Sequence, residues 1–312
     1  MSKHVSPVRR GRLTRFTAGF AVLLALVGYV VAQHLTDRGA PRCVVRAASG
    51  GPSYGLSTEM AANAATVSAV GTTRGMPERA VTIALATALQ ESGLRNIRHG
   101  DRDSLGLFQQ RPSKGWGSPE RILDPVYSAG KFYDQLAEVP GWSRLPLTVA
   151  AQRVQRSGFP QAYAKHEPDA TLLAAALTGR AGAALTCDGD GGGGGGDEAG
   201  DPARVRAELE RAFGAHVLLP KVSGGPGRAG AQQAREIAVP VGPAGGERGS
   251  GGASRRGWEL AHWAVARAEG LGIGEVRLGD RVWSAERAGD GWRTTAPGRG
   301  AGDGTVRILV AH

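Results

Sequence analysis

The stretch that decides the fold is Val81-Thr-Ile-Ala-Leu-Ala-Thr-Ala-Leu-Gln-Glu91-Ser92-Gly93-Leu94, and it is followed by Ser104-Leu-Gly106-Leu107-Phe108-Gln109-Gln110. The first segment has the apolar spacing of a helix that faces a core, with Glu91 at the edge of the apolar face and near the helix end. Backbone carbonyls at a helix C-terminus carry partial negative charge, and burial disfavours a charged carboxylate. The sequence therefore predicts a raised pKa for Glu91, as a general acid for glycoside cleavage requires. The alternative is a surface ion pair with Arg95, four residues on.

Glu91-Ser92 followed by Gly106-Leu107-Phe108-Gln109 resembles the signature of soluble lytic transglycosylases and goose-type lysozymes. The resemblance covers roughly residues 56–177. It implies a lysozyme-like α fold, peptidoglycan as the substrate and Glu91 as the catalytic acid. The later stretch 150–163 lies where that family places an inward-facing Tyr or Asn. The residues expected to bind the substrate are Ser92, Gln109, Gln110, Trp116 and Tyr163.

A second carboxylate is the open point of this hypothesis. Asp101 and Asp103 are the nearest candidates in the long loop after Glu91, and their other interpretation is loop capping. Inverting and retaining glycosidases need a second carboxylate, whereas transglycosylases use the substrate's own hydroxyl group. The sequence leaves these routes open.

The charge balance indicates anionic partners. The chain of 312 residues has a formal net charge of +10, which draws it to anionic cell-wall polymers or to a membrane surface. Its basic residues are scattered, and no zinc-finger, helix-turn-helix or RNP pattern is present, so nucleic-acid binding is not expected.

The N-terminus indicates export. A basic tail at 1–15 precedes an uncharged apolar run at 16–32, which as a helix is about 25 Å long and near the lower limit for a membrane span. Basic residues before the run place the N-terminus in the cytoplasm and the rest of the chain outside. The sequence thus predicts a single-pass membrane anchor, and the alternative is a signal peptide cleaved near Ala32.

Two cysteines, Cys43 and Cys187, bracket the stretch that resembles lysozymes. An exported chain folds in an oxidising compartment, where a disulfide persists. The even count and the bracketing positions predict a bridge, the alternative being two free thiols.

Composition divides the rest of the chain. A spacer at 33–55 is followed by the helical domain at 56–187, and a Gly-rich linker at 188–202 separates it from the last part, 203–312. In that last part, helical patterns give way to short alternating stretches. The predicted fold is therefore a mainly α lysozyme-like domain plus a smaller α+β domain, joined by the linker, behind the N-terminal helix.

The C-terminal domain resembles domains of secreted cell-wall proteins that are related in fold to zinc D,D-peptidases. The residues that carry this resemblance include Trp258-x-x-Ala261-His262-Trp263, Arg281-x-Trp283-Ser284 and Gly291-Trp292-Arg293. The His-x-His strand of those peptidases is replaced here by Val306-Arg-Ile-Leu-Val310, and His216, His262 and His312 do not supply a zinc pattern. We expect this domain to be non-catalytic, and the chain to need no metal and no cofactor.

Two hypotheses about function remain. The first is an exported, membrane-anchored glycosidase or lytic transglycosylase that cleaves peptidoglycan with Glu91 as its acid. The second is a catalytically silent cell-wall-binding or scaffold protein on the same fold.

Overall fold

A computed structural model of the chain describes residues 42–47, 50–159, 161–188, 200–218, 235–241, 255–295 and 304–311. About half of the structure is helix, with smaller sheet regions, so the fold mixes α and β structure. Residues from Arg42 onward form one compact unit. The predicted tail at 1–15, the predicted anchor at 16–32 and most of the predicted linker lie outside the described residues. Among those that are described, no helix is long and apolar enough to span a bilayer.

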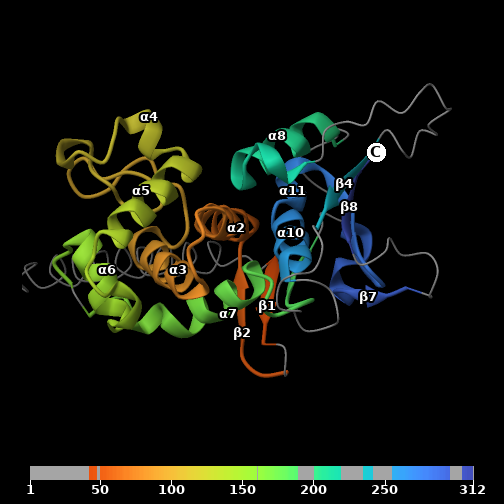
Figure 1. The fold of residues 1–312 in the computed structure, drawn as a ribbon, viewed down its shortest axis with the longest axis horizontal. Coiled ribbons are helices and arrows are strands. Elements are labelled where there is room, and N and C mark those ends of the chain that lie inside the picture. The colour runs from red at the N-terminus through yellow and green to blue at the C-terminus, as the bar shows by residue number, and fades with distance from the viewer. Residues whose placement is uncertain are drawn as a thin grey trace, which may run out of the picture. The chain divides into compact units, whose positions relative to one another are not determined.

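The helical part of the unit is built around one central helix (Figure 1). Its helices are α2 (Thr58–Thr73), α3 (Glu78–Ser92), α4 (Pro119–Ile122), α5 (Pro125–Ala137), α6 (Leu147–Gln155) and α7 (Glu167–Leu177). Helix α3 packs against α2, α5, α6 and α7. Its alanines at 80, 84, 86 and 88 are buried, and their small side chains let the neighbouring helices approach. The helix that carries Glu91 is therefore fixed on several sides.

Helix α3 ends abruptly after Glu91. Gly93 and Leu94 both have left-handed backbone angles, with φ of 63° and 59°. The amide of Gly93 bonds to Leu89 O at 3.0 Å, as in an αL C-cap, and that of Leu94 bonds to Ala88 O at 3.1 Å, so both amides close the helix end. The Leu94 side chain is fully buried, so its packing fixes the direction in which the chain turns. Glu91 thus lies in a last turn that holds no basic residue.

A small antiparallel sheet closes the helical part and holds the disulfide. Strand β1 (Cys43–Arg46) lies between β2 (Ser53–Leu56) and β3 (Leu185–Cys187). Cys43 and Cys187 are directly opposed in the β1–β3 register, and they form the predicted disulfide across 144 residues of sequence. The bridge is confirmed, and it ties the strand before the helices to the strand after them.

Removal of this bridge should cost stability. A chain with both Cys43→Ser and Cys187→Ser loses the crosslink that restricts its unfolded state, so we expect the free energy of unfolding to fall by about 2–5 kcal/mol. Urea unfolding of both chains under oxidising conditions measures the difference. Added reductant should lower the stability of the natural chain and leave the double variant unchanged. Equal stability of the two oxidised chains would contradict the expected contribution.

The last third of the chain forms an antiparallel sheet with helices. Its elements are α8 (Pro202–Phe213), β4 (Glu236–Pro240), α10 (Arg255–Ala266), α11 (Ala268–Leu271), β5 (Ile273–Leu278), β6 (Arg281–Ser284), β7 (Arg293–Thr294) and β8 (Thr305–Val310). The strand order is β4-β8-β5-β6-β7, and every described pairing is antiparallel. Alternate residues of β8 are buried, as a strand with one covered face requires.

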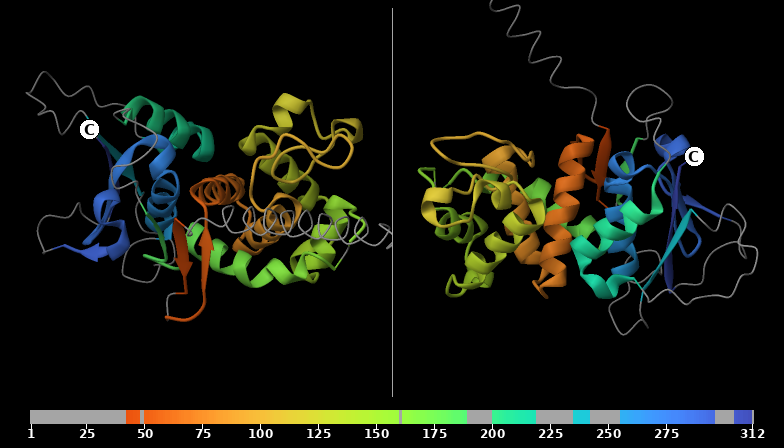
Figure 2. Two further views of the ribbon diagram at one scale, coloured as in Figure 1. Left: turned by 180° about the vertical axis from the view of Figure 1, so that it is seen from behind. Right: turned by 90° about the horizontal axis from the view of Figure 1, so that it is seen from above.

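Helix α10 joins this sheet to the helical part. It contacts β5 and β8 on one side and α2, α7 and β3 on the other, as Figures 1 and 2 show. Every residue from Gly257 to Ala266 is buried, because both faces of the helix are covered. The parts predicted as domains at 56–187 and 203–312 therefore pack closely together in this unit.

Candidate active site

Glu91 is half-buried, and a tyrosine from a distant part of the chain meets it. The Tyr163 hydroxyl donates a hydrogen bond of 2.7 Å to Glu91 Oε1 across 72 residues of sequence. The Tyr163 ring is fully buried, just before α7, so packing fixes the direction of its hydroxyl. The two residues that the sequence singled out for the acid and its neighbour are thus brought together.

The environment of Glu91 favours its protonated form. Loss of hydration on burial raises the pKa of the carboxyl group, and hydrogen bonds from Tyr163 and Gln155 lower it by less. The net result is a pKa above that of an ordinary glutamate. A carboxyl group that keeps its proton to higher pH can donate it to a leaving oxygen.

Gln155 is a site residue that sequence reasoning missed. It ends helix α6, and its amide Nε2 donates to Phe108 O at 2.7 Å, while the side chain lies close enough to Glu91 to lower the pKa of that carboxyl. It therefore links Glu91 to the turn at 105–110, which contains Gly106. A glutamine at a helix end carries no distinctive sequence signal. Gln155 does lie in the stretch 150–163, where the family that the sequence resembles places an inward-facing Tyr or Asn.

The turn at 105–110 is a tight reversal that contacts the ends of α3 and α6 through Ser92 and Gln155. Leu105 and Gln110 exchange backbone hydrogen bonds of 2.9 and 3.0 Å, and Gly106 and Gln109 between them have φ of 75° and 48°. A Cβ at Gly106 would lie 2.8 Å from Ile122 O, so this position needs glycine both for its angle and for space. The turn is thus held in one conformation.

Ser92 connects this turn to the end of α3. Its hydroxyl donates to Leu107 O at 2.8 Å and to Ala88 O at 3.1 Å, and the side chain is buried. Phe108 is buried next to it and stacks on Phe132 with 4.7 Å between ring centroids. The two halves of the motif therefore form one packed unit, in which Ser92 positions the turn from within the core.

The remaining predicted substrate residues divide into two kinds. Gln109 and Trp116 are half-buried; the Gln109 amide donates to Gly106 O at 3.1 Å, and the Trp116 carbonyl accepts from Tyr127. Gln110 is only 1% exposed, and its amide donates to Ser128 O at 3.0 Å. Because Gln110 faces the core, its place is structural, and no substrate reaches it in this conformation. The pattern of adjacent glutamines could not tell which of them turns inward.

The candidate second carboxylates are engaged elsewhere. Asp103 accepts hydrogen bonds of 2.8 Å from the Arg111 guanidinium and from the Ser113 amide. The bond from Arg111 is the main cause that holds the pKa of Asp103 far below its ordinary value. Asp101 is exposed beside Arg102. The capping interpretation of Asp103 agrees with these contacts.

A variant of Tyr163 tests the electrostatics of this site. In Tyr163→Phe, the carboxylate loses a hydrogen bond that favours its charged form, so we expect the pKa of Glu91 to rise further. An NMR titration of the carboxyl carbon of Glu91 measures it. Tyr127→Phe, which removes a hydroxyl bonded to Trp116, is the matched control and should leave this pKa unchanged. A lower or unaltered pKa in Tyr163→Phe would contradict the assigned contact.

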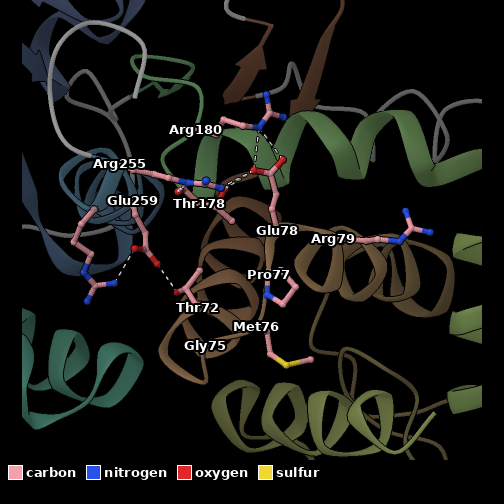
Figure 3. A pocket seen from close by; sticks show the side chains of 11 residues that line it. Thr72, Gly75, Met76, Pro77, Glu78, Arg79, Thr178, Arg180, Arg255 and Glu259 are labelled. Carbon is pink, nitrogen blue, oxygen red and sulfur yellow. Dashed lines mark hydrogen bonds and ion pairs between the residues drawn. The ribbon is translucent and has the colours of Figure 1, made fainter. Parts of the chain in front are cut away.

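A cavity of about 750 Å³ lies at the opposite end of α3, about 20 Å from Glu91 along the helix. Figure 3 shows it where the turn between α2 and α3 meets the end of α7 and the start of α10. Glu78 accepts from Arg180 at 2.9 Å and from Arg255 at 2.8 Å. Glu259, nearly buried, accepts from Arg256 at 2.7 Å and from Thr72. Both carboxylates of the cavity are therefore neutralised by arginines, and two of these contacts, Glu78–Arg255 and Thr72–Glu259, fasten α10 to the helical part.

The C-terminal histidines do not gather into a metal site. Among the described residues, no group of three His, Cys, Asp or Glu side chains could hold a metal ion. His216 is exposed, and His312 lies outside the described part. His262 is fully buried, with Nδ1 at 2.8 Å from Ala176 O and Nε2 at 3.2 Å from the Ala184 amide. Burial lowers the pKa of His262 to about 4, so it is a neutral side chain that bridges α10 to α7 and β3.

The C-terminal tryptophans are used in packing. Trp258, Trp263 and Trp283 are buried. The indole of Trp283 donates to Thr186 Oγ1 at 3.2 Å, and that of Trp292 donates to Leu185 O at 2.9 Å. These contacts hold β3, the strand that carries Cys187.

No protein-family model matches the chain, and no curated protein matches it either.

Proposed function

We propose that the chain is an exported peptidoglycan-cleaving enzyme of the lytic transglycosylase or lysozyme type, with Glu91 as its general acid. The observation that carries the proposal is the half-buried Glu91 carboxyl, with a raised pKa and a 2.7 Å hydrogen bond from Tyr163. The protonated carboxyl donates its proton to the glycosidic oxygen as the bond to the sugar breaks. Tyr163 and Gln155 lie against the acid, Ser92 holds the turn that follows it, and Gln109 and Trp116 remain our candidates for substrate contacts.

The intramolecular route is the better supported of the two. Hydroxyl and amide groups, not a carboxylate, hydrogen-bond to Glu91 among the described residues, and Asp103 is bound by Arg111. Without a second carboxylate to activate water, the substrate's own hydroxyl attacks the anomeric carbon and gives its proton back to the Glu91 carboxylate. This closes an anhydro ring and regenerates the acid. Membrane attachment through 16–32 and binding to anionic wall polymers complete the proposal.

Digestion of purified peptidoglycan by the chain, followed by mass spectrometry of the soluble products, tests the proposal. Transglycosylation gives sugar ends that are one water lighter than the ends from hydrolysis. Release of such products supports the intramolecular route, and reducing ends support hydrolysis. If no soluble product appears over a range of pH and salt, the alternative of a catalytically silent wall-binding protein is favoured.

A further inference from the structure

Phe159 is the one large apolar side chain that is exposed in the described part of the chain, at 76% of its surface. Burying a phenylalanine stabilises a protein by roughly 1.5–3 kcal/mol, so this position gives up stability that the other aromatic residues provide. A single exposed apolar residue is common on protein surfaces and carries no meaning by itself. The exposure of Phe159 is informative because this residue lies close to Glu91.

The backbone on both sides of Phe159 is held by hydrogen bonds. Helix α6 ends at Arg156, whose φ is 52°, and the Gln152 amide then donates to Ser157 O at 2.8 Å. The Phe159 amide donates to Ser157 Oγ at 3.1 Å, and its carbonyl accepts from the Ala162 amide at 3.1 Å. The ring is thus exposed on a residue whose own amide and carbonyl are both hydrogen-bonded.

The same loop leads directly to the acid. The Ser157 hydroxyl that accepts from the Phe159 amide lies beside the Tyr163 side chain. Tyr163 in turn donates to Glu91 Oε1. Only the side-chain hydroxyls of Ser157 and Tyr163 thus lie between the Phe159 amide and the Glu91 carboxylate. A sugar next to the bond that Glu91 protonates therefore comes within reach of the ring.

We propose that Phe159 is a substrate-binding residue, whose ring stacks on the apolar face of a pyranose of the bound glycan. The axial C–H groups of a pyranose form a flat apolar patch that suits the face of an aromatic ring. Burial of this patch against Phe159 recovers the hydrophobic free energy that exposure forgoes. The choice of a glycan as the ligand rests on the proposed function of Glu91, and the stacking itself does not depend on catalysis.

Binding without cleavage tests the stacking. The full chain carrying Glu91→Gln is mixed with insoluble purified peptidoglycan at high salt, which screens the positive charge of the protein. In this background, Phe159→Ala should lower the affinity roughly tenfold. Phe159→Trp should bind as well as phenylalanine, whereas Phe159→Leu should bind as weakly as alanine. This order separates ring stacking from simple apolar contact, for which leucine would suffice.

Two further readouts complete the test. Because Phe159 is exposed, its variants should unfold at the same temperature as the natural chain, and Gln161→Ala in the same loop should bind normally. In the catalytically competent chain, Phe159→Ala should raise KM and leave kcat nearly unchanged, since stacking is the same in the ground and transition states. Equal binding by all variants, or no binding by any chain, would overturn the proposal. If binding follows the expected order but the natural chain cleaves nothing, the proposed function fails and Phe159 retains its role.

Discussion

Replacement of Glu91 by glutamine is expected to reduce peptidoglycan cleavage by at least about 100-fold. The amide has the shape of the carboxyl group and still accepts the Tyr163 hydrogen bond, but it has no proton to give to the leaving oxygen. The release of soluble fragments from purified peptidoglycan measures the loss. Since the protonated form of Glu91 is the active one, activity of the natural chain should fall as pH rises through the raised pKa of this group.

A control variant at another carboxylate shows whether the loss of cleavage is specific to Glu91. Glu138→Gln removes an exposed carboxylate at the end of α5, and it should leave cleavage unchanged. Both variants should melt at nearly the same temperature as the natural chain. Full activity in Glu91→Gln would remove Glu91 from the role of acid and would direct attention to another carboxylate.

The second large effect is expected when the C-terminal part is removed. A chain that ends at Asp188 retains every helix of the part that carries Glu91, but it loses α10, which packs against α2, α7 and β3. Surfaces that are covered in the whole chain become exposed, and the carbonyl of Ala176 and the amide of Ala184 lose His262. Because domains are stable by only about 5–15 kcal/mol, we expect the truncated chain to show no cooperative unfolding transition in circular dichroism.

Point variants in the C-terminal part measure its contribution to stability without truncation. Trp283→Ala removes a buried indole and should lower the free energy of unfolding by about 3–5 kcal/mol. Trp283→Phe retains most of the volume and loses mainly the hydrogen bond to Thr186, so it should cost about 1 kcal/mol. A truncated chain that unfolds cooperatively at the temperature of the whole chain would show that the two parts are independent domains.

The sequence predicted the core of the site because its signals are local. The apolar face of α3, the glycine that ends it and the glycine of the following turn each have one physical solution, and together they place Glu91. The pairing of Glu91 with Tyr163 was accessible through the family resemblance. The disulfide followed from an even number of cysteines that bracket the helices.

What the sequence could not predict is which way the polar and aromatic side chains turn. Gln109 and Gln110 are neighbours of the same type, yet the backbone turns at Gln109 with a left-handed φ, so that Gln109 is half-buried and Gln110 lies in the core. The tryptophans of the last third look like ligand-binding residues in a list of residue types. Their burial against β3 depends on the packing of α10 between two layers, which no local pattern encodes.

The position of α10 also sets the order of events during synthesis. Trp283 bonds to Thr186 across 97 residues, Trp292 to Leu185 across 107, and the disulfide spans 144. Contacts between residues so far apart in sequence slow folding, because the entropy lost on closing a long loop precedes the stabilisation that the contact provides. The strand that bears Cys187 therefore gains its final partners only after almost the whole chain has emerged. If the chain is exported as we propose, α2 and α7 complete their packing against α10 outside the membrane, after the last third of the chain has crossed it.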